Sequence, residues 1–387
     1  MHFVQAKSLL TRWNGMNLYR GCTQGCAYCD SRSACYQIGH AFEDVAVKVN
    51  APELLEDVLR RRRKPCMIGT GSMSDPYQPI ERDLRLTRRC LELIRDYGFG
   101  ASVITKSDLV LRDADLLEDV NRRTKAVVQV TLTIADDGLS RVVEPGVCPS
   151  SRRFEVLCEL RDRHIPTMVW LCPFLPWLTD SDANFLTLLD WCVEAQVKGI
   201  VCVGVGLTLR EGSREHFYAF LDRRFPGLSD RYRATYGDAY NVVSENNDRL
   251  MARFDDVCER HGILHAPDEC FANAAEFPDL QPRLFRAKWP KHPRDQSATV
   301  YAPRHRMGST YSSSPTSRAN SEMPTTTATN SGGRTRDAGF AVSFRLSLRR
   351  AANPSSTFSS DVLISMAAHR PSNSSIMTST SRSESSR

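Results

Sequence analysis

The stretch GCTQGCAYCD, residues 21–30, places Cys22, Cys26 and Cys29 within eight residues. Glycines and polar side chains make up most of the rest, so the stretch reads as a polar loop rather than as the apolar face of a helix or strand. Three thiolates can hold a four-iron cluster and leave one iron without a protein ligand, where a small molecule can bind. The spacing therefore predicts an iron–sulfur cluster with one open iron.

A metal site without catalytic function is the alternative for the same cysteines. A structural zinc site needs four ligands, and the nearest further donors are Cys35 and His40. No second pair of Cys or His follows at the spacing of a zinc finger. In this alternative Cys35 joins the three loop cysteines as the fourth ligand of zinc or of an iron–sulfur cluster, and the protein is a binding module.

The remaining cysteines and the apolar stretches predict a compartment. The ten cysteines outside the loop are scattered singly, mostly in apolar stretches where a free Cys behaves as a small hydrophobe. Residues 1–12 lack the apolar run of a secretory signal. The longest apolar stretch, residues 168–178, is about half the length that a bilayer requires. We therefore expect a reduced, cytoplasmic protein that does not enter a membrane.

The C-terminal part of the chain differs in composition from the rest. Residues 301–387 contain eleven arginines, no lysine and four acidic residues, so the net charge of +6 resides there and residues 1–300 are close to neutral. The segment is also rich in serine, a composition typical of disorder. We predict a Ser/Arg-rich disordered tail over residues 286–387. The near-neutral body gives no separate argument for binding nucleic acid.

Six short apolar or β-branched runs alternate with amphipathic segments between residues 1 and 270. Such runs are typical of buried parallel strands, and their steps of roughly thirty residues match a βα unit. The predicted strands are 17–21, 66–70, 101–106, 126–134, 167–172 and 199–207, and the predicted helices are 52–64, 83–98, 113–123, 150–164, 182–196, 214–225 and 247–262. This α/β pattern forms either a barrel or a doubly wound sheet.

Candidate functional residues lie at or just after the ends of several predicted strands. Cys22 follows the first strand, Gly71 the second and Lys106 the third, and Thr133 lies near the end of the fourth. In both architectures, functional groups gather at the carboxyl ends of the strands. We therefore expect these residues to meet at one rim of the sheet.

The CxxxCxxC spacing, with Tyr28 before the third cysteine, resembles the signature of the radical S-adenosylmethionine (SAM) enzymes. A closer resemblance, to the members of this superfamily related to spore photoproduct lyase, is carried by NLYRGCTQGCAYCDSRSACY (17–36), IGTGSMSDPYQP (68–79), ITKSDLVLRD (104–113) and TLTIADD (131–137). It covers residues 1–285. For that range it implies a radical SAM core domain, a partial (β/α)6 TIM-like barrel, with a C-terminal helical extension.

The resemblance also implies two cofactors, a [4Fe–4S] cluster on the three cysteines and SAM at the open iron. A donor such as flavodoxin or ferredoxin reduces the cluster, which cleaves SAM to methionine and a 5′-deoxyadenosyl radical that abstracts hydrogen from the substrate. Ser74, Asp75 and Lys106 match positions that contact SAM in the family. Gly71 and Thr133 lie beside them and are further candidates for SAM binding.

Two departures separate the chain from the lyase itself. The lyase has a hydrogen-donating cysteine where this chain has Ser72, whose O–H bond is much stronger than an S–H bond, and a tyrosine where this chain has Asp30. Tyr28 and Cys35 remain as candidate catalytic residues, the latter as a second radical donor. We expect a lyase-like radical SAM enzyme whose substrate is unidentified, with a nucleic acid as the first class to test and a peptide or small metabolite as the second.

Overall fold

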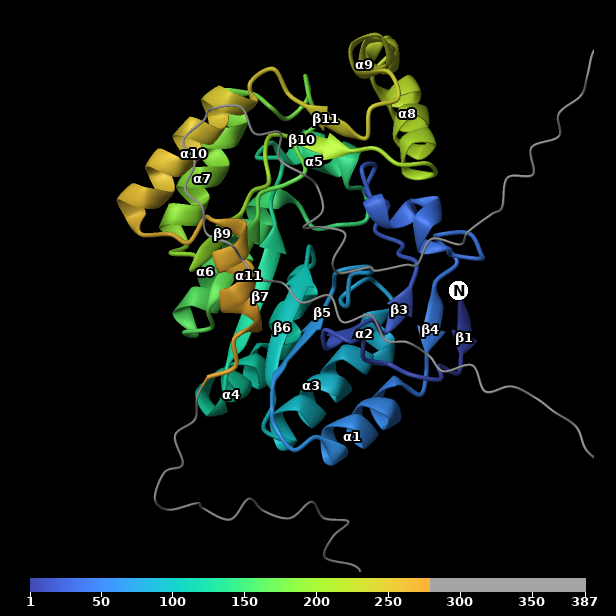
Figure 1. Cartoon of the computed structure of the whole chain (residues 1–387), viewed down its shortest axis with the longest axis vertical. Coiled ribbons are helices and arrows are strands. Elements are labelled where there is room, and N and C mark those ends of the chain that lie inside the picture. The colour runs from blue at the N-terminus through green and yellow to red at the C-terminus, as the bar shows by residue number, and fades with distance from the viewer. Residues whose placement is uncertain (279–387) are drawn as a thin grey trace, which may run out of the picture. The chain divides into compact units, whose positions relative to one another are not determined.

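Six parallel strands form the central sheet of the protein (Figure 1). The computed structural model describes residues 1–278. The strands lie in the sheet in chain order, and every neighbouring pair is parallel. They are β2 (Gly15–Met16), β5 (Met67–Thr70), β6 (Gly100–Thr105), β7 (Ala126–Thr131), β8 (Thr167–Trp170) and β9 (Gly199–Val201). The predicted partial TIM-like barrel is confirmed.

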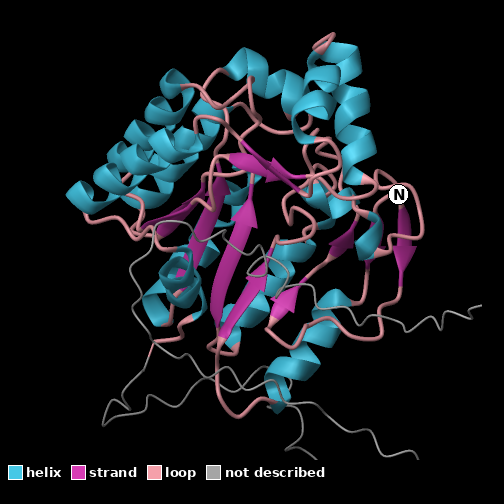
Figure 2. Cartoon of the chain, turned by 45° about the horizontal axis from the view of Figure 1, so that its top comes forward, coloured by secondary structure: helices cyan, strands magenta, loops and turns pink. Residues whose placement is uncertain are grey.

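Helices connect the strands and cover the outer face of the sheet, as Figure 2 shows with strands in magenta and helices in cyan. Val103, Val128, Val169 and Ile200 alternate with inward-facing residues and pack in one apolar core with these helices. The covering helices are α1 (Ala51–Arg61), α3 (Leu86–Asp96), α4 (Ala114–Arg123), α6 (Ser150–Asp162), α7 (Asp182–Glu194) and α10 (Asn247–His261). No helix among residues 1–278 is long and apolar enough to cross a membrane.

The first strand of the barrel differs from the prediction. The predicted strand at 17–21 contains β3 (Tyr19–Arg20), which belongs to a separate three-stranded sheet with β1 (His2–Val4) and β4 (Ala46–Lys48). The barrel strand is the two-residue β2 just before it. Two residues carry no periodicity, so the hydrophobic pattern marks the neighbouring strand instead.

The last predicted strand is divided in two. After β9 the chain turns at Gly204, with φ of 116°, and continues as β10 (Gly206–Thr208), which pairs antiparallel with β11 (Asn241–Val243). A Cβ at position 206 would lie 2.1 Å from the carbonyl oxygen of Val242, so a glycine is required there. Between β10 and β11 the chain forms α8 (Ser213–Arg224) and α9 (Leu228–Tyr236), near the top of Figure 1.

A short helix covers part of the concave face of the sheet. This helix, α11 (Pro267–Ala275), packs on β9 and β5 and lies in front of the sheet in Figure 1. Phe271 packs against Trp170 with ring centres 5.7 Å apart, and Ala274 contacts Val127 and Met168. The cysteine loop and the carboxyl ends of the strands lie beyond this cover. The predicted boundary at 285/286 and the predicted tail lie outside the described residues.

A buried charge network joins the loop after β5 to the elements around it. The Glu81 carboxylate lies in α2 (Glu81–Leu84), is fully buried, and accepts hydrogen bonds from the backbone N–H groups of Leu86 and Thr87 at 3.1 Å each. The helix predicted at 83–98 is therefore interrupted, at Arg85, which has φ of 50°. Arg112 donates to Glu81 at 2.8 Å and lies 2.7 Å from the buried Asp113 carboxylate.

Removing the cation from this network tests its contribution to stability. We expect Arg112→Met to lower the free energy of unfolding by about 3–5 kcal/mol, because it leaves Glu81 with no cation beside it. Arg122→Met is the matched control, since Arg122 pairs with Asp119 at 2.5 Å on an exposed surface, and should cost less than about 1 kcal/mol. Urea unfolding followed by circular dichroism measures both changes. If both variants lost the same small amount of unfolding free energy, Arg112 would not be the cation that stabilises the buried Glu81 carboxylate.

Candidate functional site

The cysteine loop, residues 21–30, is fixed to the fold largely through its backbone. The N–H of Cys22 donates to the Phe42 carbonyl at 3.0 Å, and the N–H of Ala27 donates to the Val143 carbonyl at 2.9 Å. Gly21 has φ of 90°, and a Cβ there would lie 2.3 Å from the Phe42 oxygen, so a glycine is needed. These contacts set the path of the loop and leave its three cysteines as free thiols.

The thiols of the loop are largely buried, and a positive charge acts on one of them. Cys22 and Cys26 are buried, and Cys29 is partly buried. Burial raises the pKa of Cys22 to about 11. Burial also raises the pKa of Cys26 well above its usual value, while the Lys106 ammonium acts in the opposite direction. As the side chains stand, no three Asp, Glu, His or Cys residues in the described part of the chain form a ready metal-binding group.

Cys35 lies in a different environment from the three loop cysteines. It belongs to the short 3-10 helix η2 (Ala34–Tyr36), is exposed, and accepts a hydrogen bond from the Arg210 guanidinium at 3.3 Å. The four-thiolate alternative requires Cys35 to turn inward to the buried cysteines. Its observed position gives that alternative no support, and a role as radical donor stays a prediction.

Ser74 and Asp75 hold the ends of neighbouring strands together. The Ser74 hydroxyl donates to the Tyr19 carbonyl at 3.0 Å. One oxygen of the buried Asp75 carboxylate accepts from the Thr105 hydroxyl at 2.7 Å, and the other accepts from the Lys106 N–H at 2.8 Å. Both side chains therefore already have structural partners. Their predicted contact with SAM stays a prediction.

Gly71 lies where the loop after β5 crosses the end of β6. Its φ is 100°, and a Cβ there would lie 2.0 Å from the carbonyl oxygen of Ile104. The close approach of the two backbones excludes any side chain at this position. Gly71 is therefore explained by packing, whether or not it also contacts SAM.

Lys106 and Thr133 offer polar groups near the loop. The Lys106 ammonium lies 5.7 Å from the centre of the Tyr28 ring. Burial acts to lower the pKa of Lys106, but electrostatic interaction with its neighbours, first with Cys26 when it is ionised and then with Glu144, raises it overall. Thr133 is 1% exposed, and its hydroxyl has no hydrogen-bond partner within the residues that the structure describes. An unpaired buried hydroxyl costs about 1–3 kcal/mol, so it is a group that a ligand can satisfy.

Glu144 and Arg153 join the site, although the sequence did not identify them. The Glu144 carboxylate accepts a hydrogen bond from the Tyr28 hydroxyl and pairs with Arg153, and both charged side chains are 1% exposed. Burial acts to raise the pKa of Glu144, but Arg153 and then Lys106 hold it below its usual range. One sequence signal was available: Arg153 shares a helical stripe with the apolar residues Val156, Leu157 and Leu160.

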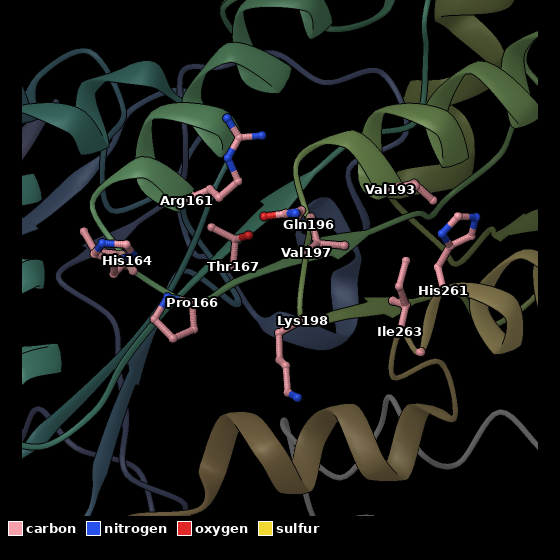
Figure 3. A pocket seen from close by; sticks show the side chains of 12 residues that line it. Arg161, His164, Pro166, Thr167, Val193, Gln196, Val197, Lys198, His261 and Ile263 are labelled. Carbon is pink, nitrogen blue, oxygen red and sulfur yellow. The ribbon is translucent and has the colours of Figure 1, made fainter.

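A cavity of about 700 Å³ lies at the amino-terminal end of β8, away from the cysteine loop. Figure 3 shows side chains from the end of α6, the start of β8 and the end of α10 around it. Its ionisable side chains are those of Arg161, His164, Lys198 and His261. Function in parallel α/β barrels lies at the opposite, carboxyl end of the strands. We therefore place the candidate site at the cysteine loop.

Comparisons with known proteins relate the chain to one superfamily. The profile of the radical SAM superfamily matches residues 16–192. An uncharacterized protein of Mycobacterium tuberculosis is 32% identical over 280 residues, which cover 70% of this chain and 81% of that protein. The radical SAM Nalpha-GlyT isomerase of Pseudomonas phage M6 is 24% identical over 161 residues, which cover 42% of this chain and 33% of the isomerase.

The fold is also similar to that of a solved structure. A C140S mutant of spore photoproduct lyase matches with a TM-score of 0.50 and 13% sequence identity, over 68% of this chain and 80% of the lyase chain. The family match implies SAM and an iron–sulfur cluster, and the residues present fit both groups in their chemistry. Three free thiols share one loop, and near the ends of β6 and β7 lie a cation and a hydroxyl that has no partner among residues 1–278. The chain belongs to the radical SAM superfamily of enzymes.

Proposed function

We propose that the protein binds one [4Fe–4S] cluster through Cys22, Cys26 and Cys29 and cleaves SAM reductively. When bound and reduced, by a donor such as flavodoxin or ferredoxin, the cluster supplies the electron that divides SAM into methionine and a 5′-deoxyadenosyl radical, which abstracts hydrogen from the substrate. The observation that carries the proposal is the three-cysteine loop at the carboxyl end of a parallel half-barrel.

Several residues of the chain have roles in this proposal. Lys106 places a positive charge beside the loop, where it attracts the carboxylate of SAM. The Thr133 hydroxyl, which lacks a protein partner in the described residues, hydrogen-bonds to SAM. Ser74 and Asp75 act mainly by holding the strand ends, since their polar atoms are already bonded. Backbone groups near Gly71 complete the contacts.

The substrate class that we propose first is a nucleic acid. Arg210 lies near the cysteine loop, 3.6 Å from the Asp30 carboxylate, with its guanidinium 5.9 Å from the centre of the Tyr36 ring and 5.1 Å from that of Tyr240. A cation beside aromatic rings offers contacts for phosphate and for stacked bases. The similar phage enzyme is named as an isomerase of Nalpha-GlyT. Repair by the route of the lyase is not proposed, because Ser72 and Asp30 replace its cysteine and tyrosine.

SAM cleavage by the full-length chain tests the proposal. Anaerobically reconstituted protein, given dithionite and SAM, should form 5′-deoxyadenosine that mass spectrometry detects, and Cys26→Ala should form none because it loses a cluster ligand. Cys35→Ala should keep the iron content of the wild type. The binding-module alternative would be supported instead if Cys35→Ala lost its metal and the wild type, with a verified reduced cluster, left SAM intact.

Replacing Thr133 by valine, which has the same shape, separates ligand binding from stability. We expect Thr133→Val to weaken SAM binding about fivefold, which corresponds to the roughly 1 kcal/mol of a typical hydrogen bond. Its melting temperature should stay the same or rise, because the unpaired buried hydroxyl is removed. Calorimetric titration and thermal unfolding of the reconstituted protein measure the two effects.

Thr124→Val is the matched control for this variant. The Thr124 hydroxyl donates to the Phe99 carbonyl at 2.9 Å, at the amino-terminal end of β7. Its loss should therefore lower stability by about 1 kcal/mol and leave SAM binding unchanged. Unchanged SAM affinity in Thr133→Val would rule out the proposed contact.

A further inference from the structure

Glu144 connects a buried ion pair to the cysteine loop. One carboxylate oxygen accepts from the Tyr28 hydroxyl, and the other pairs with Arg153. Arg153 is itself fixed, because it donates to the Thr131 carbonyl at 2.8 Å and to the Ser150 hydroxyl at 2.9 Å. Tyr28 stands directly before the third cysteine. The aromatic residue of the loop is therefore anchored through Glu144 to the end of β7 and the start of α6.

The backbone around Glu144 runs beside the loop and contacts it on both sides of Cys26. The Ala27 N–H donates to the Val143 carbonyl, and the Gly146 N–H donates to the Gln24 carbonyl, each at 2.9 Å. Cys26, Tyr28 and Val143 belong to the same buried apolar cluster. The position of the Glu144 carboxylate relative to Cys26 is thus fixed from two directions by neighbouring residues.

Charges of both signs lie near Cys26. Lys106 places a positive charge beside Cys26, and Glu144 and Asp75 contribute negative charges near the loop, while Arg153 pairs with Glu144. Both Glu144 and Arg153 are 1% exposed, so water and salt screen their fields weakly. A buried charge next to a cluster changes the relative stability of its oxidised and reduced forms. Removing the Glu144 carboxylate would leave the Arg153 guanidinium without its ionic partner and make the surroundings of the loop more positive by one charge.

We propose that Glu144 is a positioning residue that fixes Tyr28 and whose buried negative charge keeps the reduction potential of the cluster low. The proposal rests on the proposed function, since it requires a cluster on the three cysteines. A purely structural ion pair would affect folding and iron content but would not change the potential according to the sign of the charge removed.

A cycle of charge variants in the full-length chain tests this role. The cluster is reconstituted without SAM, and its midpoint potential is measured by redox titration followed by electron paramagnetic resonance. We expect Glu144→Gln to shift the potential upward, because the added net positive charge stabilises the reduced cluster. Lys106→Met should shift it downward. The double variant restores the net charge and should return close to the wild-type potential.

Two further variants serve as controls. Asp137→Asn removes a carboxylate from α5 (Asp137–Val143), where that side chain is 29% exposed, and should leave the potential unchanged. Tyr28→Phe removes the hydrogen bond to Glu144 without changing any charge, so its potential should stay close to the wild type. A shift in Tyr28→Phe as large as that in Glu144→Gln would overturn the electrostatic assignment.

The remaining outcomes separate this inference from the proposed function. A wild-type protein that forms no [4Fe–4S] signal would overturn the proposed function, and the inference with it. Two outcomes with a fully assembled wild-type cluster would overturn only the inference. In the first, Glu144→Gln has the same reduction potential as the wild type. In the second, both single variants shift the potential in the same direction. If Glu144→Gln does not assemble, Glu144→Asp, which keeps the charge, should retain the wild-type potential, and a large shift would contradict the proposal.

Discussion

The geometry of the site depends on the hydrogen bonds that the Asp75 carboxylate accepts. It accepts from Tyr77 N–H at 2.8 Å, from the Thr105 hydroxyl at 2.7 Å and from Lys106 N–H at 2.8 Å. Hydrogen bonds to an ionised group are stronger than neutral ones, and this carboxylate is 8% exposed. It thus joins the loop after β5 to the end of β6 and fixes the backbone from which the Lys106 side chain extends.

The same loop also sets where the cysteines begin. Ser74, next to Asp75, donates to the Tyr19 carbonyl at 3.0 Å, and the Tyr19 hydroxyl donates to the buried Glu81 carboxylate. Tyr19 is therefore held at both ends, three residues before Cys22. The inner side of the loop is held separately, by Val143 and Glu144. Two independent anchors thus define the path of a loop that has almost no regular secondary structure of its own.

The sequence predicted the helices and strands that have a clear hydrophobic pattern. It missed the elements and residues that depend on contacts between distant parts of the chain. The strands at 66–70, 101–106, 126–134 and 167–172 are confirmed, and each is rich in apolar or β-branched residues. The two-residue β2 has no such run, and Gly206 divides the last run through a contact with Val242 that lies far along the chain. Glu144 was missed for the same reason, because its partners Tyr28 and Arg153 lie 116 and 9 residues away in sequence. The sequence placed Ser74 and Asp75 near the site but could not show that their polar atoms were already engaged.

The concave face of the sheet restricts where a substrate can approach. Trp170 donates to the Gln129 side chain at 2.7 Å, Gln129 donates to Ser102 at 2.9 Å, and Phe271 of α11 packs against Trp170. This layer and α11 cover part of the concave face of the sheet. The cysteine loop, Lys106 and Thr133 lie after the carboxyl ends of their strands. In the function that we propose, a large substrate such as a nucleic acid would therefore present its reacting group from the rim, near Arg210, Tyr36 and Tyr240. The position that we propose for the reactive site thus agrees with the part of the concave face that side chains leave uncovered.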